Sequence, residues 1–171
     1  MNIHPISVHF PVALLTLYSV FELIRFKKLN ESSEWFYIKA VFLFVGMIGA
    51  FFSLVTGDWA GELYRGIGQL VHAHEFYMQA TVFVYGLSTI NYLIVCADKL
   101  YGKKLLYVFG KLWTLKLKGV RFVFKNWVLV LVALLGLMLL VIGGALGGAI
   151  AYGPYADPLT IPILKLLNIP Y

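Results

Sequence analysis

Charged residues and cysteine are scarce in this chain of 171 residues. Only 13% of the residues are charged, whereas 61% are hydrophobic. This composition excludes an ordinary soluble domain, in which about a quarter of the residues carry a charge. The single cysteine, Cys96, excludes an intramolecular disulfide and leaves the redox compartment open.

Several motifs that identify enzymes are also missing. The chain has no CxxCH haem-attachment motif and no phosphate-binding Walker loop. Serine, histidine and aspartate residues occur, but nothing in their spacing predicts a catalytic triad. No basic leader with a small-residue cleavage site precedes the first apolar stretch, so we expect that stretch to be retained. These absences favour a non-catalytic protein.

Long apolar runs dominate what is present. A helix needs about 20 mainly apolar residues to cross the hydrocarbon core of a membrane. Four runs meet this requirement and predict helices at about 6–26, 35–56, 74–97 and 127–151. We therefore expect residues 1–171 to form a single all-α membrane domain, a four-transmembrane-helix bundle.

The distribution of basic residues predicts how these helices are oriented. Three basic residues follow the first helix between positions 25 and 28, and eight more lie in the segment 98–126. The second link and the tail 152–171 are poor in basic residues. Cytoplasmic loops carry an excess of lysine and arginine, so we expect both termini outside and 98–126 as a basic cytoplasmic insertion. We expect the membrane to be the cytoplasmic (inner) membrane of a prokaryote.

The segment 98–126 mixes its basic residues with large apolar ones. Such a mixture suits anionic lipids of the inner leaflet, where each basic charge contributes about 1 kcal/mol. We expect lipids as partners there and no nucleic acid, because basic residues beside membrane helices follow from topology alone. A docking surface for a cytoplasmic partner stays open. Alternation around Gly119 leaves the choice between helix and strand open.

All four histidines lie where the chain meets the outer edge of the predicted bundle. His4 and His9 stand at the start of the first helix, and His72 and His74 at the start of the third. Imidazole is a common metal ligand and an axial ligand of haem iron. Ionisable groups at membrane depth usually mark function. Because the predicted topology brings both pairs to one side of the membrane, we interpret them as a candidate cofactor site.

The predicted helix faces support this interpretation. On the third helix His74, Thr81 and Ser88 recur every seven residues and share a face, which should turn towards the bundle. A similar stripe of small and polar residues on the first helix begins at His9, so His9 and His74 can face each other. His72 lies about 200° from His74 on a helix. Both histidines can therefore serve one site only if the third helix starts late enough to leave His72 outside its regular part.

Glycines on the fourth helix form two overlapping small-xxx-small motifs. Their members are Gly143, Gly144, Gly147 and Gly148. Such motifs let a neighbouring helix approach closely, and they would equally make room for a flat ring such as a porphyrin. Beyond a Gly-Pro break after this helix, residues 161–167 are predicted to form a short apolar helix along the outer surface.

The chain resembles the small four-helix membrane proteins grouped as domain of unknown function 2231. The resemblance rests on the opening 4–15, on Thr56-Gly57-Asp58 and on the glycines of 143–148. It covers the four helices but not the long basic link. That family is sometimes fused to a Rieske-type iron–sulfur domain, which implies membrane electron transfer. The family often has a histidine early in the third helix, which His72 or His74 matches, and a His-Gly after the last helix, where this chain has Tyr152-Gly153.

We therefore expect a membrane electron-transfer subunit that binds haem b near the outer face. His9 would pair with His72 or His74, and the remaining two histidines would serve a possible second haem. A bis-histidine iron has no open coordination position, which favours electron transfer over oxygen chemistry. We also expect a redox or complex partner subunit.

Two alternatives stay open. The histidines can combine with Glu75, Asp58 or Glu62 into a non-haem site for zinc, copper or iron. The chain can also be a cofactor-free structural subunit of a membrane complex, with interfacial histidines and glycines that only pack helices. For each carboxylate the simpler role is a surface or helix-capping residue.

Overall fold

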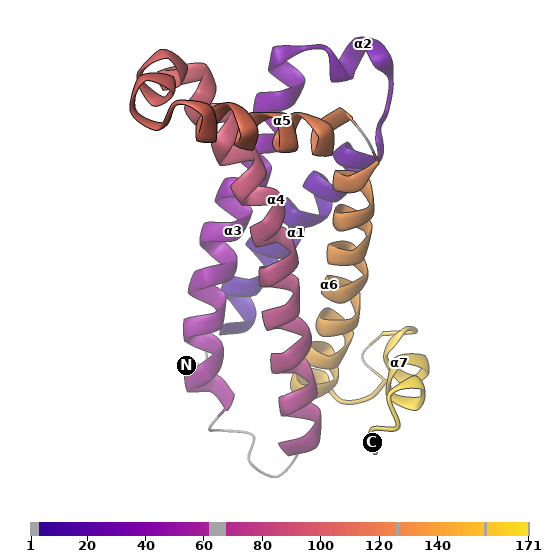
Figure 1. Cartoon of the computed structure of the whole chain (residues 1–171). Helices are drawn as coiled ribbons and strands as arrows, with labels where there is room; N and C mark the ends of the chain where they lie inside the picture. Colours follow the sequence, from indigo (N-terminus) through magenta and orange to yellow (C-terminus); the bar gives the residue numbers. More distant parts are fainter. Residues whose placement is uncertain (1–3, 62–67, 126, 156, 171) are drawn as a thin grey trace.

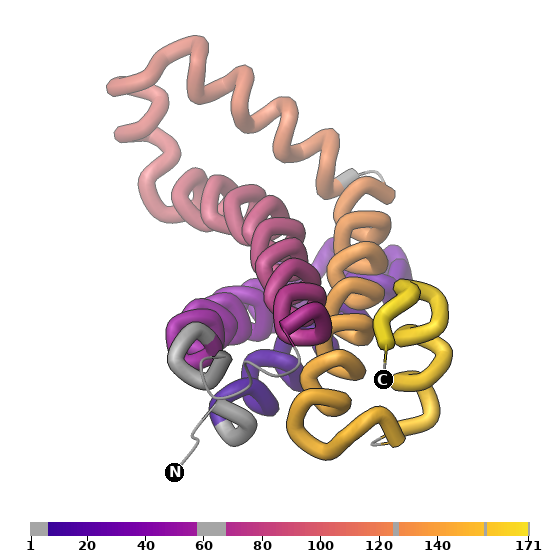
Figure 2. Tube along the Cα trace, turned by 90° about the horizontal axis from the view of Figure 1, so that it is seen from below, coloured from indigo at the N-terminus to yellow at the C-terminus, as the bar shows by residue number. Residues whose placement is uncertain are grey.

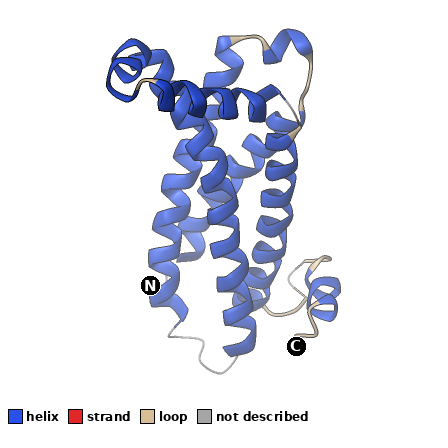
Figure 3. Ribbon diagram, viewed as in Figure 1, coloured by secondary structure: helices blue, strands red, loops and turns tan. Residues whose placement is uncertain are grey.

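The computed structural model describes residues 4–61, 68–125, 127–155 and 157–170, without the side chains of 4–6, 58–61 and 125. This part of the chain is helical (Figure 3). Its helices are α1 (His4–Leu23), α2 (Lys27–Asn30), α3 (Ser33–Gly61), α4 (Gly68–Phe109), α5 (Lys111–Lys125), α6 (Val128–Tyr152) and α7 (Thr160–Leu166).

Four helices pack side by side to form the body of the molecule (Figure 1). α1 contacts α3 and α6, and α4 also contacts α3 and α6. The short α2 and the amphipathic α5 lie at one end of these helices, and α7 lies at the other (Figure 1). The view along the helices shows α5 returning from the end of α4 to the start of α6 (Figure 2).

Among the described residues, three helices are long and apolar enough to cross a membrane, namely α3, α4 and α6. α1 is also apolar but shorter, with an apolar stretch of Ser7–Leu23. The chain leaves the helix after Leu23, three residues before the predicted end, and Phe26 is extended ahead of α2. All four predicted helices are thus present, and within the described residues three of them qualify as membrane spans.

Polar and apolar side chains are distributed as expected for a protein surrounded by lipid. Large apolar side chains such as Ile48, Phe83 and Leu131 are 60% exposed or more on the outside of the packed helices. Several polar side chains are buried between the helices: Ser19, Glu22, Lys39, Thr81 and Ser88. In hydrocarbon, polar groups are satisfied by turning towards the protein interior.

The basic segment is helical throughout its described part. α4 continues to Phe109, Gly110 makes a turn with a positive φ of 51°, and α5 follows. Trp113 and Val120, seven residues apart, are both buried, because that spacing places them on one face of a helix. Of the two possibilities left open around Gly119, helix is therefore correct. The predicted tail helix at 161–167 is confirmed by α7.

Glycines bring α6 close to α4, as predicted from the small-xxx-small motifs. A Cβ on Gly136 would lie 2.8 Å from the Tyr85 ring, and one on Gly143 would lie 2.6 Å from the sulfur of Met78. Such distances are shorter than side chains tolerate, so a larger residue would displace its neighbour: the rigid ring of Tyr85 at Gly136, or the flexible side chain of Met78 at Gly143. Gly144 is different, because its Cβ would meet no atom within 4 Å.

Replacing Gly136 by alanine should lower the free energy of unfolding by about 1–3 kcal/mol, the usual cost of overpacking. Gly144→Ala is the matched control, since it adds the same methyl to the same helix in open space. Thermal unfolding of both variants in one detergent measures the difference. Equal unfolding temperatures for the two variants would contradict the close contact between α4 and α6.

Candidate functional site

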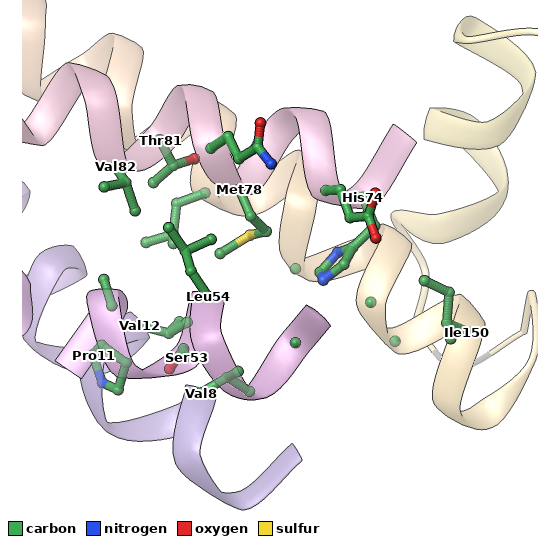
Figure 4. A pocket seen from close by; sticks show the side chains of 18 of the residues that line it. Val8, Pro11, Val12, Ser53, Leu54, His74, Met78, Thr81, Val82 and Ile150 are labelled. Atoms are coloured by element: carbon green, nitrogen blue, oxygen red, sulfur yellow. The ribbon is translucent and has the colours of Figure 1, made fainter. Parts of the chain in front are cut away.

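A cavity of about 350 Å³ lies between α1, α3, α4 and α6, at the end where α4 begins (Figure 4). Its walls are mainly apolar: Val12 of α1, Leu54 of α3 and Val82 of α4 contribute to them. On the α6 side, Gly144, Gly147 and Gly148 line the cavity together with Leu140, Ile150, Ala151 and Tyr152. The three glycines add no side chain, which leaves room in this part of the cavity.

His74 lies in the wall of this cavity, held between α4 and α6 (Figure 4). Its Nδ1 is 2.8 Å from the carbonyl oxygen of Gly143. A carbonyl only accepts hydrogen bonds, so Nδ1 carries the hydrogen, and Nε2 of the neutral ring keeps its lone pair. A Cβ on Gly147 would lie 2.9 Å from Cε1 of this ring. The glycines of α6 thus both orient the imidazole and make room for it.

His9 also lines the cavity, but its side chain is exposed. The predicted stripe on the first helix is correct only for Ser19, which is fully buried, whereas Ala13 is exposed like His9. The buried face of α1 runs through Pro11, Leu15 and Tyr18. Large apolar and aromatic side chains fill the interior there, and His9 remains at its edge. The structure therefore places His9 and His74 around the same cavity, with only His74 fixed by a hydrogen bond.

His72 does not reach the cavity. Its side chain is 82% exposed, and its Nδ1 lies 3.5 Å from Glu75 Oε2. α4 begins at Gly68, so the helix does not start late enough for His72 and His74 to serve one site. The side chain of His4, the other histidine of the predicted second pair, lies outside the described residues.

The carboxylates of the predicted non-haem site are only partly described. Glu75 lines the cavity and approaches His72. The side chain of Asp58 and the whole of Glu62 lie outside the described residues. Within the described part, no three histidine, cysteine, aspartate or glutamate side chains are grouped closely enough to hold a metal ion.

A second polar site, which the sequence analysis did not predict, lies at the opposite end of the bundle. Glu22 Oε2 accepts an ion pair from Lys39 Nζ at 2.8 Å, and the two side chains are only 1% and 6% exposed. The Tyr92 hydroxyl donates a hydrogen bond of 3.0 Å to the same oxygen. A signal was present, because Lys39 is a lone charge within its predicted apolar run and Glu22 lies within another.

Tyrosine and serine side chains continue from this ion pair into the bundle. The Tyr18 ring packs edge-on against those of Tyr85 and Tyr92, with centroids 6.0 and 5.9 Å away. The hydroxyls of Ser19 and Tyr85 share a hydrogen bond of 2.7 Å. Ser88 is fully buried beside them on α4. Polar groups from α1, α3 and α4 thus occupy the interior of the bundle.

Comparison with known proteins finds a family described as "Predicted membrane protein (DUF2231)", whose model matches residues 1–154. The match covers all four packed helices and most of the chain, and it ends before α7. Together with the three long apolar helices, it makes this an integral membrane protein. No curated protein and no solved structure matches the chain.

Lys39→Met should destabilise the protein by about 3–5 kcal/mol, because it leaves the buried Glu22 carboxylate without its counter-charge. Lys28→Met is the matched control at an exposed position. Combining Lys39→Met with Glu22→Gln should restore much of the loss, since no unpaired charge then remains. Apparent unfolding temperatures in one detergent test this, and equal values for the two single variants would contradict it.

Proposed function

We propose that this chain, which belongs to the DUF2231 family of predicted membrane proteins, is a haem-binding electron-transfer subunit of the membrane. The cavity between α1, α3, α4 and α6 would hold haem b, and His74 and His9 would bind its iron. The observation that carries the proposal is the 2.8 Å contact from His74 Nδ1 to the Gly143 carbonyl. Histidines that ligate metals almost always donate their other N–H to such a partner, which fixes the tautomer and the ring orientation.

The residues around the cavity fit a porphyrin in their chemistry. The walls are mainly apolar, and Gly144 and Gly148 add no side chain to the α6 side of the cavity. His74 and His9 come from separate helices and both line the cavity. When bound, haem would supply one-electron redox chemistry, and two histidine ligands would leave no open position for oxygen.

The chain's own residues would have distinct tasks at this site. His74 would bind iron through Nε2 while Gly143 holds its Nδ1–H. Val12, Leu54 and Val82 would exclude water from the ring face, and an apolar surrounding of this kind tunes the reduction potential. His9, which is exposed, would complete the coordination from α1.

We further propose that α1 crosses the membrane with the three longer helices and that the cavity lies near the outer face. The basic α2 and α5 lie together at the end opposite α7 (Figure 1). Lysine and arginine mark the cytoplasmic side. Both termini would then be outside, in the inner membrane of a prokaryote. A redox or complex partner subunit would receive the electron.

Residues 98–126 would bind anionic lipids of the inner leaflet. α5 buries Trp113 and Val120, whereas Leu112, Leu115 and Phe122 are at least 63% exposed beside exposed basic residues. Helices on a membrane surface typically insert apolar side chains into the acyl region. Their lysines and arginines contact the lipid headgroups.

The haem proposal predicts different results for two histidines on α4. Purified full-length chain, produced with a haem supply, should show a Soret band and a sharp reduced α band. His74→Ala should lose this absorbance, because it removes the oriented ligand. His72→Ala should keep it, since His72 is exposed and lies away from the cavity. Optical spectra with pyridine haemochrome quantification measure both.

Other outcomes of the same experiment would overturn the proposal. A featureless spectrum from folded, haem-supplied chain would exclude a cytochrome. Metal without porphyrin absorbance in elemental analysis would favour the non-haem site, and absence of both would favour the structural subunit. Equal haem content in the two variants would exclude His74 as a ligand.

Neutralising basic residues of α5 should weaken the retention of anionic lipid. Replacing Lys116, Lys118 and Arg121 together by glutamine removes three charges, each worth about 1 kcal/mol near an anionic surface. Lys165→Gln on α7, at the opposite end, is the control. Quantifying the phosphatidylglycerol that co-purifies with each variant tests this, and unchanged lipid in the triple variant would refute it.

A further inference from the structure

A second cavity of about 470 Å³ lies beside the buried ion pair, at the end of the bundle opposite the first cavity. Residues of α1, α2, α3 and α5 form it, and many of them are charged. Its lining comprises Glu22, Arg25, Lys27, Asn30, Glu31, Trp35, Phe36, Lys39 and Phe124. Unlike the first cavity, this one can therefore hold water against charged side chains.

The Glu22 carboxylate has two different oxygens. Oε2 is engaged by Lys39 and Tyr92, whereas Oε1 is buried and has no hydrogen-bond partner among the described residues. Glu22 also lines the second cavity. Buried acceptors without a protein partner are usually hydrogen-bonded to water, for which the second cavity has room. Glu22 thus lies between the second cavity and the Tyr92 hydroxyl.

Buried hydroxyl groups extend from Tyr92 towards the first cavity. On α4 they belong to Tyr92, Ser88, Tyr85 and Thr81, at steps of three or four residues, or about 4.5–6 Å along the axis. Thr81 lines the first cavity. The hydroxyl-bearing side chains of Tyr18 on α1 and of Ser88 on α4 are also fully buried, and these two side chains interact with each other.

The length of this arrangement matches a membrane. From His74 in the first cavity to Tyr92 at the ion pair, α4 advances by about 27 Å. The hydrocarbon core of a bilayer is about 30 Å thick. Ionisable residues inside membrane helices are costly and commonly form proton relays. Neither the glycine contacts nor the haem proposal accounts for the buried hydroxyl groups that are spaced along α4 between the two cavities.

We propose that the bundle conducts protons between the two cavities and that Glu22 exchanges the proton with water in the second one. Glu22 Oε2 takes a proton from the Tyr92 hydroxyl as that hydroxyl takes one from a neighbouring hydroxyl or water. Rotation about the Cγ–Cδ bond then turns the protonated oxygen towards the second cavity, where it releases the same proton to water, so the carboxylate and the Tyr92 hydroxyl return to their starting states. The charged and titratable groups near Glu22 are Tyr18 of α1, Lys39 of α3 and Tyr92 of α4. Arg25, Lys27 and Glu31 line the same cavity.

Lys39 and the tyrosines have different tasks in this proposal. Lys39 lies 2.8 Å from the Glu22 carboxylate and balances its charge once the proton has left. The hydroxyls carry no net charge while they relay a proton, which avoids an isolated ion in the apolar interior. The proposal does not depend on haem, and it can succeed or fail with cofactor-free protein.

The test is proton flux into liposomes that contain the purified full-length chain and an entrapped pH-sensitive dye. A potassium gradient with valinomycin supplies the driving voltage. Wild-type protein should carry more protons than protein-free liposomes. Tyr92→Phe should lower the flux about tenfold, which corresponds to roughly 1.4 kcal/mol in the barrier, because it removes only the hydroxyl and keeps the ring against Phe36 and Phe124.

Tyr101→Phe is the matched control, since it removes a hydroxyl from an exposed position of the same helix. Ser88→Ala provides a second, smaller change within the hydroxyl series. Wild-type flux no greater than that of empty liposomes would overturn the proposal. Equal flux in Tyr92→Phe and Tyr101→Phe would do so as well, and would leave the buried polar groups with a structural role.

Discussion

The buried ion pair between Glu22 and Lys39 is the contact on which the arrangement of the helices depends. An unpaired charge in the apolar interior would cost several kcal/mol. α1 and α3 are therefore held in the register that keeps the two charged atoms 2.8 Å apart. The hydrogen bond from Tyr92 to Glu22 connects α4 to this ion pair. The contact between the Tyr85 ring and Gly136 connects α4 to α6. One polar cluster and one glycine contact thus connect all four helices.

At the other end of the bundle, the glycines of α6 determine the packing, because they carry no side chain. Gly143 offers its carbonyl to His74, and Gly147 leaves the space that the imidazole occupies. Gly144 faces the cavity without filling it. The same glycine series therefore packs one side of α6 against α4 and leaves room in the cavity on another. Close helix packing and a site for a flat ring are compatible here, because different glycines serve each purpose.

The two proposals concern opposite ends of one molecule and share α4. An oriented histidine in an apolar cavity suits a redox centre, whereas a buried carboxylate beside a charged cavity suits proton exchange. An electron that enters a site of low dielectric is stabilised by positive charge nearby. A proton route that ends at the cavity of His74 would supply such charge, so the two activities are physically compatible within one bundle.

The sequence by itself determined the all-helical class, the four apolar helices, the tail helix and the packing role of the glycines on α6. These features follow from local composition and spacing, because a membrane helix must be long, apolar and hydrogen-bonded within itself. Only the structure showed that His74 faces the first cavity and His72 does not. α4 already begins at Gly68, so both histidines lie within the helix and on different faces of it. The tertiary structure alone paired Glu22 with Lys39, because partners on different helices depend on the register between helices, which no local pattern records.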